Sequence, residues 1–323
     1  MSFSADELAW AGDVVRRWVP PTPQLAWPLL ARRVGAEVWV KHENHTPTGA
    51  FKVRGGLVYV ERLRTERPGV AGLVSATRGN HGQSLAFAGR AAGVGVTIVV
   101  PFGNSAGKNE AIRGFGAELV EHGHDFQAAR EHASALGAAR GLEVVPPYHR
   151  DLVLGAATYA RELFDGAGEL DVVYVPVGMG TGIGGLVAVR DLLGFRTEIV
   201  GVVAAQAPAT ALSVRAGRVV TTDSANTFVD GVACRVPDPV AISAMCAGVA
   251  RIVSVGEDEA AEAMRVLLSD AHNLAEPAGA LALAGLLAER DRVTGARVAV
   301  VQTGGNADAD MLLDVLAGRT PTA

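Results

Sequence analysis

One lysine in the chain stands in a turn that could make its amine reactive. Lys52 lies between Phe51 and Val53, in a segment (residues 47–56) that reads PTGAFKVRGG. Apolar neighbours would shield the amine from water, and loss of hydration lowers the pKa of an amine toward neutrality. Such an amine can act as a nucleophile or as a base. Taken alone, the segment is equally consistent with a solvated lysine at the start of a helix.

Two further segments place glycines beside short polar residues. Residues 75–83 read SATRGNHGQ and follow a run typical of a strand. Their glycines bracket Asn80 and His81, so backbone amides would gather at the start of a helix, where anions bind. Residues 302–306 read QTGGN and also follow a predicted strand. Taken singly, each segment is better explained as an ordinary turn, with His81 packed in the interior.

A glycine-rich segment, VGMGTGIGG at residues 177–185, predicts a phosphate site. This much glycine after a buried strand lets the backbone close on a ligand, and its amides can form a nest for an anion. The spacing of Gly180, Gly182 and Gly185 also matches the dinucleotide fingerprint, which requires an acidic residue after the next strand. Here that strand runs into Ala-Gln-Ala at residues 205–207. An NAD-dependent dehydrogenase is therefore the weaker alternative.

The elements that must position these segments alternate along the chain. Short β-branched runs predict strands at 70–75, 96–101, 171–177, 198–204 and 297–302. Longer stretches rich in Ala, Leu and Arg predict helices at 82–92, 126–138, 154–164, 184–193, 257–272 and 278–290. Ser4 with Glu7 three residues later predicts a capping box at a first helix. This alternation predicts an α/β fold with mostly parallel sheets, in which ligands bind beyond the carboxyl ends of the strands.

Two lobes are expected from the length and from one proline pair. Pro146-Pro147 follows a short predicted strand at 142–145 and marks a return between lobes. We place a small domain at 66–149, inserted between the two parts of a large domain, 1–65 and 150–323.

The composition argues against several classes of protein. Of 323 residues, 49% are hydrophobic and 20% are charged, which fits a globular chain. The net charge of −5 comes without a basic run, so no nucleic-acid partner is expected, and no apolar stretch is long enough for a membrane span. Residues 1–10 contain acids where a signal peptide is basic, and we interpret the two cysteines, Cys234 and Cys246, as buried free thiols. We expect a cytoplasmic protein.

The order of the motifs is more specific than any one of them. TGAFK, GNHG, the glycine-rich segment, EPAGA at 276–280 and TGGN at 303–306 follow one another along the chain. Together they resemble the fold-type II pyridoxal-phosphate (PLP) enzymes, and most closely the serine/threonine dehydratase and serine racemase group, from about residue 20 to 308. The resemblance implies a tryptophan synthase β-like fold. Two open, twisted, mostly parallel sheets would hold the cofactor in the cleft between large PLP-binding and small substrate domains, in a homodimer.

The resemblance also implies a role for each motif. Lys52 would hold PLP covalently, Phe51 would lie against the ring, and Asn80 would bond the ring hydroxyl. Thr303 would sit at the pyridine nitrogen and Glu276 at the cofactor's edge. The phosphate would be wrapped by Gly178, Met179, Gly180, Thr181 and Gly182. The substrate carboxylate would be received by Thr77, Arg78, Gly79, Asn80 and His81.

Two positions depart from the family pattern. Family racemases carry a hydroxyl where this chain has Arg78, and a guanidinium is a poor proton donor, so racemisation is disfavoured. We interpret Arg78 as a candidate ligand for part of the substrate; a bond to nearby backbone or to the cofactor phosphate fits equally well. Some members bind a divalent cation through a glutamate where this chain has Gln206, a weak ligand for such ions. We expect no metal.

The function implied is β-elimination from a small 3-hydroxy-amino acid such as threonine, serine, phenylserine or 3-hydroxyaspartate, yielding a 2-oxo acid and ammonia. Lys52 would act as the general base. A related racemase or β-replacement enzyme is the alternative. Because the chain ends soon after TGGN, without room for a C-terminal regulatory module, we expect a role in amino-acid catabolism.

Overall fold

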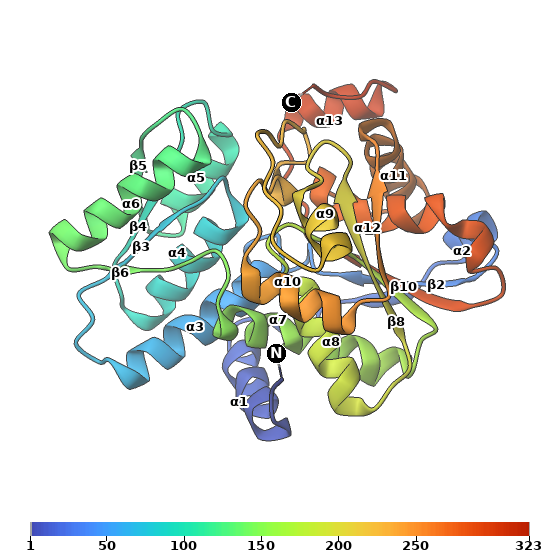
Figure 1. Ribbon diagram of the computed structural model, residues 1–323, viewed down its shortest axis with the longest axis horizontal. Helices are drawn as coiled ribbons and strands as arrows, with labels where there is room; N and C mark the ends of the chain where they lie inside the picture. Colours follow the sequence, from blue (N-terminus) through green and yellow to red (C-terminus); the bar gives the residue numbers. More distant parts are fainter. Residues whose placement is uncertain (1, 323) are drawn as a thin grey trace.

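The computed structural model describes residues 2–322 and contains two separate sheets, seen side by side in Figure 1. The larger has six strands in the order β1 (Gln24–Ala26), β2 (Glu37–His42), β10 (Arg297–Gln302), β7 (Val172–Pro176), β8 (Glu198–Ala204) and β9 (Arg251–Val255). Its neighbours pair in parallel except β1 and β2. The smaller, wholly parallel sheet has the order β5 (Glu118–Glu121), β4 (Val96–Val100), β3 (Leu73–Ala76) and β6 (Glu143–Val144).

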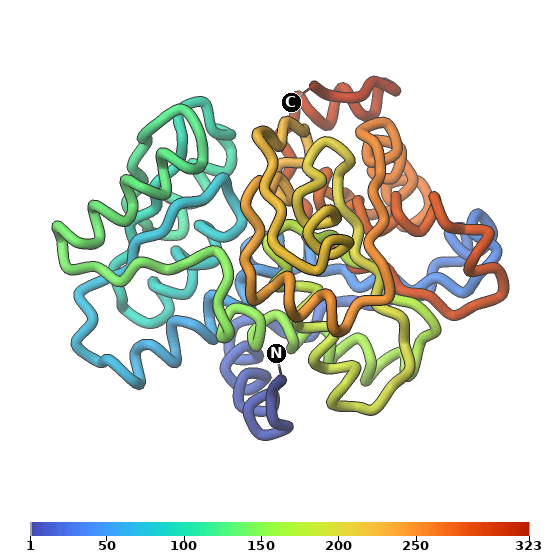
Figure 2. The backbone as a smooth tube through the Cα atoms, viewed as in Figure 1, coloured from blue at the N-terminus to red at the C-terminus, as the bar shows by residue number. Residues whose placement is uncertain are grey.

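Helices connect and cover these strands, and the tube in Figure 2 follows the chain from one sheet into the other and back. The helices in the first half of the chain are α1 (Ala5–Arg16), α2 (Pro28–Val34), α3 (Lys52–Glu66), α4 (Asn80–Ala92), α5 (Ala106–Gly114), α6 (Phe126–Arg140) and α7 (Arg150–Ala167). Those that follow are α8 (Thr181–Leu193), α9 (Ala209–Ala216), the short η1 (Asp230–Val232), α10 (Pro239–Gly248), α11 (Glu257–Ala271), α12 (Pro277–Ala288), the short η2 (Arg290–Arg292) and α13 (Ala309–Leu316).

The inner strands β10, β7 and β8 of the larger sheet are buried on both faces, which explains their nearly continuous apolar sequences. In β7, Val173 and Val175 belong to one hydrophobic core together with residues of α7 and α8. Val172 and Tyr174 belong to a second core together with residues of α11 and α12. Successive side chains of a strand point to opposite faces, so a strand between two helical layers needs apolar residues at every position. This confirms the predicted α/β fold with mostly parallel sheets.

Most predicted elements form, and one strand needs correction. β8 and β10 have the predicted bounds, and the capping box of Ser4 and Glu7 starts α1. The strand predicted at 70–75 begins only at Leu73, because the amide of Val70 closes a turn onto the carbonyl of Arg67. The four strands of the smaller sheet lie between residues 73 and 144, while the domain bounds themselves stay a prediction. Within residues 2–322, no helix has the length and apolarity needed to cross a membrane.

Glycines bring three helices into close contact around the start of α3. A Cβ on Gly55 would lie 2.8 Å from the carbonyl oxygen of Leu152 in α7, and one on Gly155 would overlap the carbonyl oxygen of Arg54. A Cβ on Gly56 would overlap Oγ of Ser84 in α4. Backbones can approach this closely only where no side chain intervenes. The glycine pair after Lys52 therefore holds α3 against both α4 and α7.

A charged cluster is buried where β2, α3 and α7 meet. The guanidinium of Arg54 donates to Glu43 and Glu162, each over 2.7 Å, and the amine of Lys41 donates to Glu162, also over 2.7 Å. The side chains of Lys41, Glu43 and Arg54 have no exposed surface. Burial opposes the charge of Arg54, but the neighbouring charge of Glu43 raises its pKa above the ordinary value. Arg54 is two residues from Lys52, so this cluster anchors the turn that carries the lysine.

We predict that Arg54→Met strongly destabilises the protein. Removing one partner leaves Glu43 as a buried charge without its guanidinium, which typically costs about 3–5 kcal/mol in the free energy of unfolding. Urea denaturation followed by circular dichroism measures this loss.

Arg17→Met is the matched control, because the side chain of Arg17 is 57% exposed in its pair with Glu61. We expect that variant to lose less than about 1 kcal/mol. Equal losses in the two variants would contradict an anchoring role for Arg54.

Candidate active site

A pocket opens at the carboxyl ends of strands of the larger sheet, where all five sequence motifs converge. Its walls come from the first residues of α3, α4 and α12, from the turns after β7 and β10, and from η1. The lining residues are Phe51, Lys52, Asn80, Pro176, Gly178, Met179, Gly180, Thr181, Gly182, Gly231, Val232, Glu276, Ala278 and Thr303. Segments separated by more than 200 residues in the sequence thus form one cavity.

Lys52 is the first residue of α3 and reaches the pocket beside an aromatic ring. Its Nζ lies 4.8 Å from the ring centroid of Phe51. Burial lowers the pKa of the Lys52 amine, and the charge of Glu276 partly opposes this shift. The amine is thereby poised to lose its proton more easily than a solvated lysine, which is the property that the sequence predicted for it.

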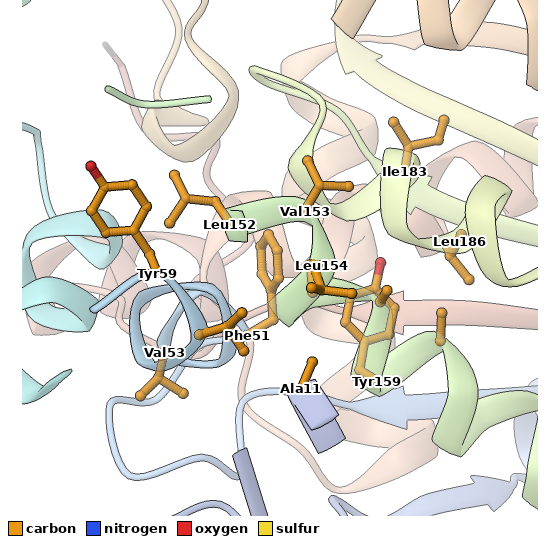
Figure 3. Packing of buried hydrophobic residues seen from close by; sticks show 14 of the residues in the cluster. Ala11, Phe51, Val53, Tyr59, Leu152, Val153, Leu154, Tyr159, Ile183 and Leu186 are labelled. Atoms are coloured by element: carbon orange, nitrogen blue, oxygen red, sulfur yellow. The ribbon is translucent and has the colours of Figure 1, made fainter. Parts of the chain in front are cut away.

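Phe51 links the lysine turn to the glycine-rich turn through Tyr159. The rings of Phe51 and Tyr159 meet edge to face with centroids 5.9 Å apart, and the hydroxyl of Tyr159 donates to the carbonyl of Gly182 over 2.8 Å. Figure 3 shows these two rings among Val153, Leu154 and other core residues. Tyr159 belongs to α7, so one helix aligns both walls of the pocket.

The turn at the start of α8 needs glycine at three positions because side chains there would be strained or crowded. Gly180 adopts φ +97°, a conformation that disfavours side chains. A Cβ on Gly178 would lie 3.1 Å from the carbonyl of Gly231, and one on Gly182 would lie 3.2 Å from the Tyr159 hydroxyl. This turn lies in the pocket wall at the N-terminus of a 13-residue helix, where backbone amides can form a cradle for a phosphate.

Glu276 carries the most perturbed carboxyl of the pocket. It is 1% exposed, and its Oε1 accepts from Asn80 Nδ2 over 2.6 Å, while Oε2 has no hydrogen-bond partner in residues 2–322. Asn306 Nδ2 donates to Asn80 Oδ1 over 2.9 Å and fixes the amide in turn. Burial raises the pKa of Glu276 to about 7, and the charge of Lys108 opposes the shift. Glu276 Oε2 is therefore available to form a hydrogen bond with a bound ligand.

The predicted carboxylate-binding loop is only partly in the pocket wall. Of its residues, Asn80 lines the pocket, whereas Thr77, Arg78, Gly79 and His81 do not. The hydroxyl of Thr77 accepts from the amide of Gly79 over 3.0 Å, and Arg78 is exposed. Burial, aided by the charge of Lys52, lowers the pKa of His81 to about 3, so its imidazole is neutral. The binding roles assigned to this loop stay predictions.

Several residues around the pocket escaped the sequence prediction. Tyr159 carried no motif, and neither did Gly231 and Val232 of η1, which complete the wall. Lys108 of α5 has its Nζ 4.0 Å from Glu276 Oε2. No local pattern marks such residues, because each acts through a partner far away in the sequence. In residues 2–322, no group of three or more His, Cys, Asp or Glu is arranged to hold a metal ion.

The fold and the site define an α/β enzyme with a lysine amine facing an anion cradle across one pocket. The family model for "Pyridoxal-phosphate dependent enzyme" matches residues 15–304, so the chain belongs to this PLP-dependent family. A glycine-rich turn at the start of a helix and a buried lysine with a lowered pKa, which line the same pocket, fit a phosphorylated aldehyde. The dehydrogenase alternative is thereby set aside.

Relatives of known activity extend the likeness over most of the chain. The L-threo-3-hydroxyaspartate ammonia-lyase of Saccharomyces cerevisiae is 29% identical over 96% of this chain and 95% of its own length. The L-threonine ammonia-lyase of Thermotoga maritima is 33% identical over 88% of this chain and 71% of its own length. The solved structure of a threonine deaminase from T.th. is 30% identical, with a TM-score of 0.88 over 95% of this chain and 99% of that one.

We predict that Glu276→Gln changes the pH dependence of stability in the cofactor-free protein. The carboxyl of the unfolded chain loses its proton near pH 4.5, whereas the folded protein retains it to about pH 7. This contribution to folding is fully present below pH 4.5 and disappears as the pH rises through about 7. Between these values the wild type should lose up to about 3 kcal/mol relative to Glu276→Gln.

Thermal unfolding of both proteins across this pH range measures the difference. Glu110→Gln removes a carboxyl whose side chain is 74% exposed and serves as the control. Parallel stability curves for wild type and Glu276→Gln would contradict the shifted pKa.

Proposed function

We propose that the protein catalyses PLP-dependent β-elimination from a 3-hydroxy-amino acid, releasing ammonia and a 2-oxo acid. The observation that carries this proposal is that the Lys52 amine and the glycine cradle line the same pocket. The two ammonia-lyases that match most of this chain support the reaction class. Threonine, serine, phenylserine and 3-hydroxyaspartate are the candidate substrates.

The pocket residues divide between holding the cofactor and handling the substrate. Lys52 would hold PLP covalently, with Phe51 beside the ring and the backbone of residues 178–182 around the phosphate. Asn80 and Glu276 would face the ring hydroxyl and the cofactor's edge, and Thr303 the pyridine nitrogen. Thr303 Oγ1 donates to the carbonyl of Ala278 over 3.4 Å. As a neutral hydroxyl it would bond the ring nitrogen without the charge that an aspartate would bring. Bound PLP supplies an electron sink for the bond that breaks next to the substrate's α-carbon.

Lys52 is the side chain best placed to move the substrate's α-proton. Its amine lies in the pocket, and burial favours the unprotonated form that a general base requires. The amides around residues 77–81, at the start of α4, would orient the substrate carboxylate. Overall, the substrate loses water across its α and β carbons, and hydrolysis of the resulting imine then restores one water and releases ammonia.

Elimination is favoured over racemisation by the residue before Gly79. A racemase needs a proton donor on the opposite face of the substrate, and this chain has an exposed guanidinium at Arg78. The serine racemase of Schizosaccharomyces pombe, 27% identical over 94% of this chain, keeps racemisation as the alternative. We also propose a homodimer, as the order of the sequence motifs implies by family resemblance. Cys234 and Cys246 are both free thiols, which fits the cytoplasm; Cys234 is buried as expected, whereas Cys246 is exposed.

The first test is a panel of the four candidate substrates with the purified enzyme. We expect a yellow protein that forms a 2-oxo acid from at least one of them, and Lys52→Ala to abolish this activity. Borohydride reduction and peptide mapping should place the cofactor on Lys52. A colourless protein, or label on another lysine, would refute the assignment.

A second test concerns the exposed guanidinium. If Arg78 reads the substrate side chain, Arg78→Ala should lower kcat/KM unequally across the panel, by roughly tenfold or more for a substrate that pairs with the guanidinium. Arg90→Ala, in the exposed last turn of α4, is the control. Equal losses on all four substrates would exclude a side-chain-reading role.

A further inference from the structure

A buried lysine connects the two sheets at the mouth of the pocket. Lys108 belongs to α5 of the smaller sheet's half, and its Nζ lies 2.5 Å from Oδ2 of Asp230 in η1. The side chains of Lys108 and Asp230 are 9% and 25% exposed. An ammonium is costly to bury, so its place beside the pocket requires the opposite charge. This charge comes from the other half of the molecule.

The same lysine touches the loop that is expected to receive the substrate carboxylate. A Cβ on Gly79 would lie 2.6 Å from Cδ of Lys108, so the lysine stem fills the space beside that loop. Its ammonium lies between Asp230 and Glu276, whose Oε2 is 4.0 Å away. Lys108 therefore contacts the loop before α4 on one side, and Asp230 and the pocket residue Glu276 on the other.

A second link beside Lys108 joins the same two halves. The hydroxyl of Ser105, the N-cap of α5, donates to Oδ1 of Asp308, shortly after the turn that carries Thr303. The amide of Lys108 donates back to this hydroxyl over 3.1 Å. The start of α5 is thus held at two points: Lys108 pairs with Asp230 of η1, and Ser105 bonds Asp308 after the turn that carries Thr303.

We propose that Lys108 is a positioning residue for the reaction: its ion pair with Asp230 holds the loop at residues 77–81 at working distance from the Lys52 amine and the glycine cradle. This inference rests on the proposed function, because it assigns the loop to the substrate. Without the pair, the smaller sheet and its loop move away from η1. The substrate carboxylate then binds out of line with the base.

Three variants test the pair: Lys108→Met, Asp230→Asn and the double variant. We expect each single variant to lower kcat/KM by about 100-fold, the typical effect of a displacement of about 1 Å in an active site. Both a fall in kcat and a rise in KM should contribute. The double variant should lose no more than Lys108→Met, because two residues that act as one pair are not additive.

Hydrogen exchange supplies a readout that does not depend on activity. In Lys108→Met, the amides of residues 77–81 should exchange faster, whereas the amount of bound cofactor should stay at the wild-type level because Lys108 does not line the pocket. Arg113→Met, on the same helix with a side chain 44% exposed in its pair with Glu110, should match the wild type in every measurement.

The outcomes separate the positioning role from its alternatives. A lower melting temperature for Lys108→Met with unchanged kcat/KM and exchange would mean that the pair only stabilises the fold. Additive losses in the double variant would mean that the two residues act independently. If the wild type eliminates none of the substrates, the proposed function fails, but faster exchange at residues 77–81 in Lys108→Met would still support the positional contact.

Discussion

The pocket depends on how the first turn of α3 is anchored in the interior. Arg54 is held by two carboxylates with no exposure of its own to water, and the glycines that follow allow α4 and α7 to approach the backbone of α3. A turn held by charge and by close packing has few alternative conformations. The amine of Lys52 is therefore directed into the pocket by groups that never touch the ligand.

Helix α7 also holds the wall of the pocket that is formed by the glycine-rich turn. Through Tyr159, α7 contacts both the aromatic residue before the lysine and a carbonyl of the glycine-rich turn. The turn that carries the base and the turn that forms the anion cradle are therefore both held in place by contacts with α7. Catalysis by positioned groups requires such preorganisation, because small displacements of a base or an anion site reduce the rate steeply.

The sequence predicted the parts of the molecule that local patterns determine. Strands β8 and β10 have the predicted bounds because their apolar runs are continuous between polar flanks, and the motifs around Lys52 and Gly180 line one pocket as their order implied. The pairing of Lys108 with Asp230 could not be foreseen, since 122 residues separate them. Arg78, singled out by its departure from a family pattern, is exposed because the type of a residue does not determine where its side chain points.

The close contact of Gly56 with Ser84 also restricts how α3 and α4 can move relative to each other. Because Gly56 lies against Ser84, whose hydroxyl donates to the carbonyl of Lys52 over 2.6 Å, α3 and α4 cannot slide past each other without a collision. The contact therefore fixes the register between the turn that carries Lys52 and the helix that begins at Asn80.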